Sequence, residues 1–210
     1  MVTREQLEQA MDQRFGREVY DRFKAARVCI AGLGGLGSNI ALMLARSGIG
    51  TLKLIDFDVV DITNLNRQAY RIEHIGQPKT EALKQMIQEI NPYLTVETVQ
   101  GKVTENNMEA LFSRETLVCE AFDNPQAKAM LVNYLLEHQP ETRICAGSGM
   151  AGYGSSNEIV TTHPMKQLYL CGDRVSDSYA GIGLLSPRVS LCAAHEANMV
   201  LRLLLGEEDV

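Results

Sequence analysis

The stretch VCIAGLGGLGSNIALMLARSG (Val28–Gly48), followed by TLKLIDFD (Thr51–Asp58), decides the fold. Its short apolar start, which ends in glycine, predicts a buried strand, and the apolar periodicity that follows predicts a helix closed by Gly48. The second apolar run, which ends in acids, predicts another strand. A strand, a helix and a strand within about 30 residues have the size of a parallel crossover unit.

The same alternation continues along the chain, and it predicts an α/β fold of the Rossmann-like type. We expect a three-layer αβα sandwich with a mostly parallel sheet and some antiparallel strands in the C-terminal part. One domain is expected over residues 1–210, with an N-terminal helix within residues 1–25. The predicted helices are 4–24, 36–48, 78–90, 104–112, 125–137 and 187–206, and the predicted strands are 28–32, 51–58, 95–99, 117–121, 143–146, 156–162 and 166–170.

Composition excludes several classes of protein. The chain has 210 residues and a formal net charge of -6, which makes nucleic acid an unlikely partner. The N-terminus has no apolar core, and no apolar run approaches the roughly 18 residues that span a bilayer. We therefore expect a cytoplasmic protein without a membrane segment. The five cysteines form no Cys-x-x-Cys pair, so we expect neither a disulfide framework nor zinc.

Three glycines form the pattern G-x-G-x-x-G at the first strand-to-helix junction: Gly32, Gly34 and Gly37, with Gly35 between them. Glycine permits a tight turn and a close approach of phosphate to the helix start. Asp56 lies 24 residues after Gly32, and Asp58 lies two residues further on. A carboxylate at about this distance from the glycine pattern commonly binds the ribose hydroxyls of a nucleotide. The pattern predicts a nucleotide site and leaves NAD and ATP open.

The segment after these acids favours ATP. Asn64, Arg67 and Gln68 lie in the predicted loop after the second strand, and Lys79 begins the next helix. Arginine offers a planar fork to phosphate oxygens and lysine offers a mobile point charge, so together they can clamp a triphosphate. Taken singly, Arg67 and Lys79 also suit an ordinary solvated surface.

The successive motifs GLGGLGS, IDFD, NLNRQ, GQPK and FDN resemble the ThiF/MoeB family, the bacterial relatives of ubiquitin-activating enzymes, over residues 26–205. The resemblance implies an adenylyltransferase that uses ATP and Mg²⁺ to activate the C-terminal glycine of a small ubiquitin-like sulfur carrier ending in Gly-Gly. The pathway would be thiamine thiazole or molybdopterin synthesis, with the thiazole pathway preferred. Family members are commonly homodimers.

The resemblance also implies roles for particular residues. Asp56 would bind the ATP ribose, and Asn64 and Arg67 would bind phosphates. Lys79 would contact phosphates at the reacting centre, and Asp123 of FDN would bind Mg²⁺. From the local pattern alone, Asp123 is equally well explained as a turn residue before Pro125.

The chain departs from the family in three places. It lacks the two Cys-x-x-Cys pairs of the zinc lobe, so it resembles the compact second ThiF-like subgroup. Its N-terminus lacks the usual arginine motif, for which Arg14 or Arg17 is a candidate substitute in a partner's site. Cys171 lies just beyond a predicted strand, where it would be either a nucleophile in acyl or sulfur transfer or a structural side chain.

Three alternatives compete with this hypothesis. In the first, the substrate is another carboxylate, either that of the molybdopterin carrier or that of threonylcarbamoyl-adenosine in tRNA. An NAD-dependent oxidoreductase uses the same glycine turn. A scaffold protein would keep the nucleotide site without turnover.

Overall fold

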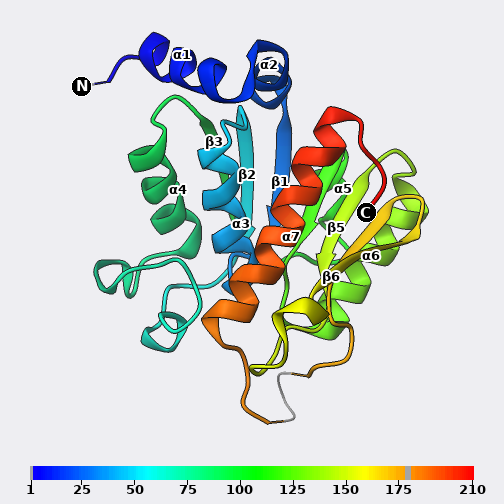
Figure 1. The fold of residues 1–210 in the computed structure, drawn as a ribbon. Coiled ribbons are helices and arrows are strands. Elements are labelled where there is room, and N and C mark those ends of the chain that lie inside the picture. The colour runs from blue at the N-terminus through cyan, green and yellow to red at the C-terminus, as the bar shows by residue number, and fades with distance from the viewer. Residues whose placement is uncertain (1, 178–180) are drawn as a thin grey trace.

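The computed structural model describes residues 2–177 and 181–210, and it contains a seven-stranded sheet (Figure 1). All neighbouring strands pair in parallel except β6 and β7. The predicted fold class, including the antiparallel pairing near the C-terminus, is confirmed. In spatial order the strands are β3 (Thr95–Gln100), β2 (Thr51–Asp56), β1 (Arg27–Ala31), β4 (Leu117–Glu120), β5 (Arg143–Gly147), β7 (Leu168–Gly172) and β6 (Val160–Met165).

Helices cover both faces of the sheet and one of its ends (Figure 1). One face carries α3 (Gly35–Arg46), α4 (Lys79–Ile90) and α7 (Ser186–Leu205). The opposite face carries α5 (Met108–Phe112) and α6 (Pro125–His138). At the N-terminal ends of the parallel strands lie α1 (Arg4–Phe15) and α2 (Arg17–Ala25).

The sheet order changes direction at β1, and this change creates the place for a ligand. The chain goes from β1 outward to β2 and β3 on one side, then returns to place β4 on the other side of β1. The loops that leave β1 and β4 therefore diverge at their carboxyl ends. In open α/β sheets, such a switch point is where ligands bind.

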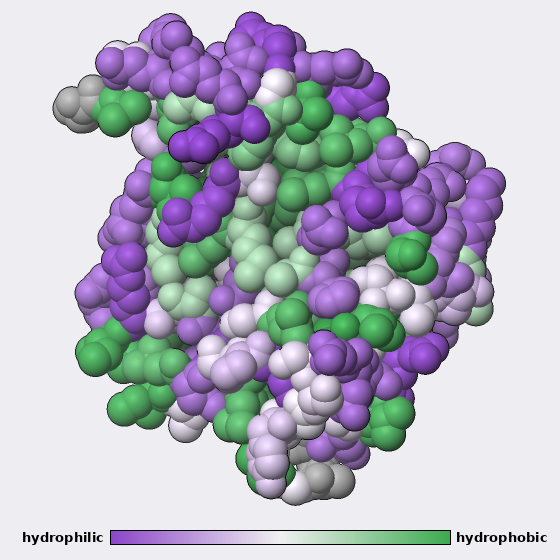
Figure 2. Space-filling view, viewed as in Figure 1, coloured by the Kyte–Doolittle hydropathy of each residue, from purple (hydrophilic) through white to green (hydrophobic). Residues whose placement is uncertain are grey.

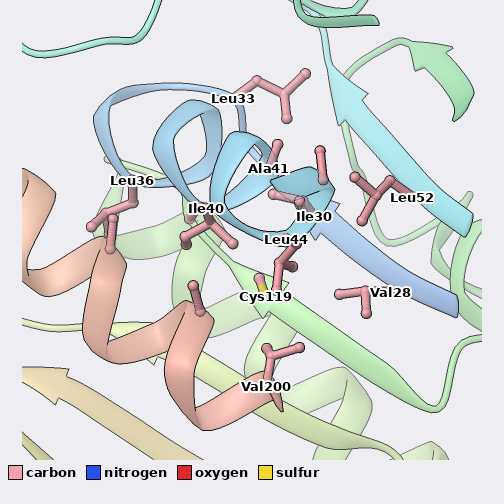
Figure 3. Close-up of a cluster of buried hydrophobic side chains, with 14 of the residues drawn as sticks. Val28, Ile30, Leu33, Leu36, Ile40, Ala41, Leu44, Leu52, Cys119 and Val200 are labelled. Atoms are coloured by element: carbon pink, nitrogen blue, oxygen red, sulfur yellow. The ribbon is translucent and has the colours of Figure 1, made fainter. Parts of the chain in front are cut away.

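The helix α3 carries the central part of the core (Figure 3). Its side chains Leu36, Ile40 and Leu44 repeat at a spacing of four residues and are buried. They pack between the β1 residue Ile30 and the α7 residue Val200. Each such side chain contributes about 1.5–3 kcal/mol when it is fully removed from water. This packing fixes the start of α3 against the end of β1.

The side of the molecule drawn in Figure 2 has a hydrophilic region and an apolar region. Hydrophilic residues cover the two N-terminal helices, whereas apolar residues run down the centre, where Figure 1 places α3 and α7. Partly buried side chains there include Leu42, Met43 and Leu201. None of the helices in the described ranges has the length and apolarity needed to cross a bilayer.

The N-terminal segment differs from the prediction of one helix over residues 4–24. Gly16 has φ +82 and separates α1 from α2, because glycine adopts this left-handed conformation without steric cost. The first helix buries none of its residues, whereas α2 buries Tyr20 and Phe23. The spacing of apolar residues was continuous, but the backbone turn at Gly16 divides it.

The predicted position of Cys171 outside a strand was wrong. Cys171 belongs to β7, is fully buried and pairs in register with Gly147 of β5. Its Sγ lies 3.6 Å from Thr161 Oγ1. Burial raises the pKa of the Cys171 thiol, so the thiolate that a nucleophile needs is disfavoured. The strand continues two residues beyond the apolar run because β6 and β5 both supply backbone partners.

We predict that Gly37→Ala lowers the free energy of unfolding by about 3 kcal/mol, because an added methyl group overpacks the loop. A Cβ on Gly37 would lie 1.8 Å from the carbonyl oxygen of Gly32. Urea denaturation of both proteins measures the difference. The control is Gly101→Ala, whose Cβ would meet no atom within 4 Å. Equal midpoints for Gly37→Ala and the unchanged protein would contradict the close approach.

We also predict that the native protein has no fast-reacting thiol. All five cysteines are buried, and burial raises the pKa of each thiol. Titration with Ellman's reagent should release colour rapidly only after addition of denaturant. A native thiol that reacts at the denatured rate and disappears in Cys171→Ser would restore Cys171 as a candidate nucleophile.

Candidate functional site

The glycine turn between β1 and α3 lies at the switch point of the sheet. Gly32 has φ +91, and a Cβ there would lie 2.7 Å from the carbonyl oxygen of Ala121. Gly34 is the N-cap of α3, and Gly35 is its first residue. The first amides of a helix have no partners within the helix, so they can bind an anion at this end.

Asp56, the last residue of β2, holds this turn in place. Its buried carboxylate accepts hydrogen bonds from the amide of Leu33 at 2.6 Å and from the amide of Asp58 at 2.8 Å. Each carboxylate oxygen has a further lone pair available to a ligand hydroxyl. Asp56 therefore fixes the glycine turn and also borders the cavity in front of it.

Lys79 and Asp58 form an ion pair at the β2 side of the turn. The Lys79 Nζ lies 2.8 Å from Asp58 Oδ2, and only 6% of the lysine side chain is exposed, compared with 45% of the aspartate side chain. Lys79 is the first residue of α4. The burial restricts the lysine to one direction, while its partner stays solvated. An anionic ligand can therefore compete with Asp58 for the ammonium group.

Arg67 and Gln68 extend from the loop between β2 and α4 to the same turn. Arg67 donates from Nη1 to the backbone oxygen of Thr63 at 3.2 Å and to Asn66 Oδ1 at 2.8 Å. Its Nε and the Oε1 of Gln68 are buried without a hydrogen-bond partner in the part of the chain that the structure describes. Buried polar atoms normally find partners. These two atoms thus mark a place where a polar ligand would complete the hydrogen bonding.

Asn64 differs from its neighbours because its side chain serves the loop itself. Its Oδ1 accepts a hydrogen bond from the amide of Asp61 at 3.0 Å and closes a short turn. Asn64 does not line the cavity as the described residues define it. The sequence motif Asn-Leu-Asn-Arg-Gln does not reveal that Asn64 shapes the loop whereas Arg67 and Gln68 line the cavity.

The loop after β4 supplies the opposite side of the cavity. Asp123 lines it and is exposed. The next residue is Asn124, whose Oδ1 accepts a hydrogen bond from the amide of Ala127 at 2.9 Å and so caps α6. The cap of α6 is therefore made by Asn124, and the Asp123 carboxylate is exposed at the cavity.

A second ion pair at this edge was not predicted from the sequence. Glu120, the last residue of β4, is fully buried and pairs with Lys128 of α6, which lines the cavity. Burial raises the pKa of Glu120, and the charge of Lys128 opposes this rise. A signal was present in the sequence, since an acid at the end of an apolar strand needs a nearby cation.

These groups surround one cavity of about 1220 Å³, which is larger than the roughly 300–1,000 Å³ of most ligand pockets. It runs from the glycine turn across the ends of β4 and β5. Of the predicted site residues, it brings together Gly32, Gly34, Gly35, Asp56, Asp58, Arg67, Gln68, Lys79 and Asp123. Gly37, Asn64 and Cys171 are not in its lining among the described residues.

Arg14 and Arg17 lie in or beside the N-terminal helices, at the opposite end of the strands from the cavity (Figure 1). Arg17 forms ion pairs with Asp12 at 3.7 Å and Asp21 at 3.3 Å. Neither arginine reaches the cavity of its own chain. Their contribution to the site of a second copy stays a prediction.

The arrangement suits a reaction at a phosphate. The amides at the start of α3, the cations Arg67 and Lys79, and the exposed carboxylate of Asp123 face a cavity with room for a nucleotide and a second reactant. Negative charge that develops on phosphate oxygens would be stabilised by groups already in place.

The comparisons with known proteins agree with this geometry. The sequence profile of the ThiF family matches residues 7–210. The chain is 36% identical over 118 residues to a molybdopterin-synthase adenylyltransferase of Salmonella typhimurium, which covers 56% of this chain and 47% of that protein. It is 35% identical over 147 residues to a tRNA threonylcarbamoyladenosine dehydratase of Haemophilus influenzae, and this alignment covers 66% of this chain and 56% of that protein. The chain thus spans about half the length of these curated relatives.

The fold is similar to that of a solved structure over its full length. The crystal structure of E. coli tRNA N6-threonylcarbamoyladenosine dehydratase in complex with ATP superposes with a TM-score of 0.87, at 23% identity, over 99% of this chain and 98% of that one. Because the family profile matches nearly the whole sequence, the resemblance predicted from the motifs is confirmed, and the chain belongs to the ThiF family.

Proposed function

We propose that this chain is an ATP- and Mg²⁺-dependent adenylyltransferase that activates the C-terminal carboxylate of a small ubiquitin-like sulfur carrier. The observation that carries the proposal is the convergence of Asp56, Arg67, Lys79 and Asp123 on the glycine turn. The relative from Salmonella typhimurium, which is named as an adenylyltransferase acting on molybdopterin synthase, supports the reaction type.

The reaction follows from the charges in the cavity. One oxygen of the carrier carboxylate attacks the α-phosphorus of ATP, the bond from that phosphorus to the oxygen bridging to the β-phosphate breaks, and pyrophosphate leaves. The product is an acyl adenylate. Arg67 and Lys79 would bind the phosphate oxygens on which negative charge increases. The amides at the start of α3 would orient the phosphates. Asp56 would position the ribose.

The residues present fit Mg²⁺ together with a triphosphate. Mg²⁺ is commonly held by one or two carboxylates plus phosphates and water, and Asp123 supplies an exposed carboxylate at the cavity. Within residues 2–177 and 181–210, no group of three or more histidine, cysteine or acidic side chains is arranged around a metal position. When bound, the ion would neutralise charge on the phosphates.

The acceptor end of the cavity favours a peptide tail. The part beyond β5 is lined by Ser148, Gly149, Met150 and Ala151, with Leu184 and Val189 of the segment around the start of α7. These side chains are small or apolar, and the lining residues Ser176 and Asp177, which lie beside Ala151, add a hydroxyl and a carboxylate but no cation. An extended Gly-Gly tail fits such a wall, whereas a polyanionic RNA would need cations. The net charge of -6 agrees with a protein acceptor.

We propose the thiamine thiazole pathway for the carrier. This part of the proposal rests on the resemblance to the compact ThiF-like subgroup without Cys-x-x-Cys pairs. Association into a homodimer, with Arg14 or Arg17 of one copy near the nucleotide of the other, belongs to the same proposal.

A second candidate is adenylation of the carboxylate of threonylcarbamoyl-adenosine in tRNA. The observations that favour it are the 35% identity to the Haemophilus influenzae dehydratase and the fold similarity over the full chain. The same cavity and the same attack on the α-phosphorus would serve this acceptor.

We predict Mg²⁺-dependent exchange of labelled pyrophosphate into ATP that requires a carrier ending in Gly-Gly. Exchange should be measured with the thiazole carrier, the molybdopterin carrier and threonylcarbamoyl-adenosine tRNA from one organism. The thiazole carrier should be the best acceptor, and the same carrier without its last glycine should give no exchange. Exchange with tRNA alone would favour the second candidate, and thermal stabilisation by NAD but not by ATP with Mg²⁺ would contradict adenylation.

We predict that Lys79→Met and Arg67→Gln each lower kcat/KM for exchange by about 100-fold or more, because each removes a charge from the phosphates. Both variants keep much of the apolar stem, so their Tm should change by only a few degrees. The matched control is Arg71→Gln, which removes an exposed arginine of the same segment that pairs with Glu73 and Glu89. If Arg71→Gln lowers kcat/KM as much as the site variants do, the losses reflect a disturbed loop conformation and not the removal of phosphate contacts.

A further inference from the structure

The ion pair at the end of β4 adjoins the glycine turn. In the parallel register of β4 and β1, Glu120 lies opposite Ala31, and Ala31 is the residue directly before Gly32. Its Oε2 contacts the ammonium group of Lys128, and its Oε1 accepts a hydrogen bond from the amide of Phe122 at 2.8 Å. The carboxylate thus has two partners and no exposure.

Lys128 is the one member of this pair that reaches the cavity. Its side chain is 27% exposed, and it lines the same cavity as the glycine turn. An ammonium group has three donor hydrogens, and among the described residues Lys128 donates to Glu120 alone. Further acceptors from a ligand can therefore be added without breaking the contact with Glu120.

A further acid near this pair is Glu196 of α7. It is fully buried, and neither of its carboxyl oxygens has a hydrogen-bond partner among the described residues. Burial raises the pKa of Glu196 well above its ordinary value; Lys128 opposes this rise and Glu120 adds to it. The ion-pair partner of Lys128 is Glu120.

Glu196 lies next to Gly147, the last residue of β5, at the cavity wall. A Cβ on Gly147 would meet Leu36 Cδ1 first and would lie 2.9 Å from Glu196 Oε1. Lys128 faces both the buried carboxylate of Glu120 and the open cavity.

The two lysines flank the glycine turn from opposite sides. Lys79 follows the loop from β2, whereas Lys128 lies on the β4 side, and β1 runs between these strands. Each has a carboxylate partner, Asp58 or Glu120. An anion held at the start of α3 would therefore have a cation on either side, which is the arrangement that a phosphate chain needs.

We propose that Lys128 is a further phosphate-binding residue of the cavity and that Glu120 positions its ammonium group toward the glycine turn. This inference rests on the proposed binding of ATP and adds a cation on the β4 side of the site. A purely structural role is the competing explanation. Buried ion pairs are often replaceable by neutral residues of similar volume without loss of stability, so the two roles can be separated.

The test is the double variant Glu120→Gln with Lys128→Met, which removes both charges and keeps the volumes. Binding of ATP with Mg²⁺ and of adenosine is measured by isothermal titration calorimetry, without turnover. We expect the Kd for ATP to rise about tenfold or more, while the Kd for adenosine stays within about twofold. Lys128→Arg, which keeps the cation, should return the ATP affinity to within about threefold of the unchanged protein. Unchanged ATP affinity in the double variant would overturn the inference.

The single variant Glu120→Gln keeps the test decisive if the double variant does not fold. If Glu120 positions Lys128 for phosphate, Glu120→Gln should weaken the binding of ATP several-fold and leave the binding of adenosine unchanged. If the pair only supports the turn, ATP affinity and adenosine affinity should fall together, which would overturn the inference. Lys84→Met, on α4 and outside the cavity lining, is the matched control. An unchanged protein that does not bind ATP would refute the proposed function itself, whereas ATP binding that ignores Lys128 refutes this inference alone.

Discussion

The close approach of α3 to the turn that follows β1 is the constraint on which the rest of the site depends. Gly37 allows the helix to contact the carbonyl oxygen of Gly32, and the carboxylate of Asp56 holds the amide of Leu33. Together they direct the first amides of α3 toward the switch point of the sheet. Any side chain at Gly37 would move the helix, and the anion site would move with it.

Paired charges are the second feature of the site. Lys79 has Asp58 as its partner, and Lys128 has Glu120. Each pair keeps a cation oriented in the absence of a ligand, so little reorganisation is needed when an anion binds. The two pairs differ in burial, because Asp58 is solvated whereas Glu120 is fully buried.

The cysteines and the N-terminal helices show how local patterns mislead. Cys171 followed an apolar run and was predicted to leave the strand, yet β5 and β6 extend the pairing through it. Backbone partners from distant segments decided its burial and therefore its pKa. A continuous apolar spacing likewise crossed Gly16, where one backbone angle divides the helix in two. Neither effect is local to the residues that carried the prediction.

The sequence by itself determined the α/β class, the positions of most strands and helices, and the glycine turn with Asp56, because these depend on periodicity and on short-range conformational preferences. It also identified Arg67, Lys79 and Asp123, which the folded chain brings to one cavity. Only the tertiary structure decided that Asn64 serves its own loop and that Lys128 joins the site. The physical reason is that partners of a side chain come from elements far apart in sequence, and spacing along the chain does not record them.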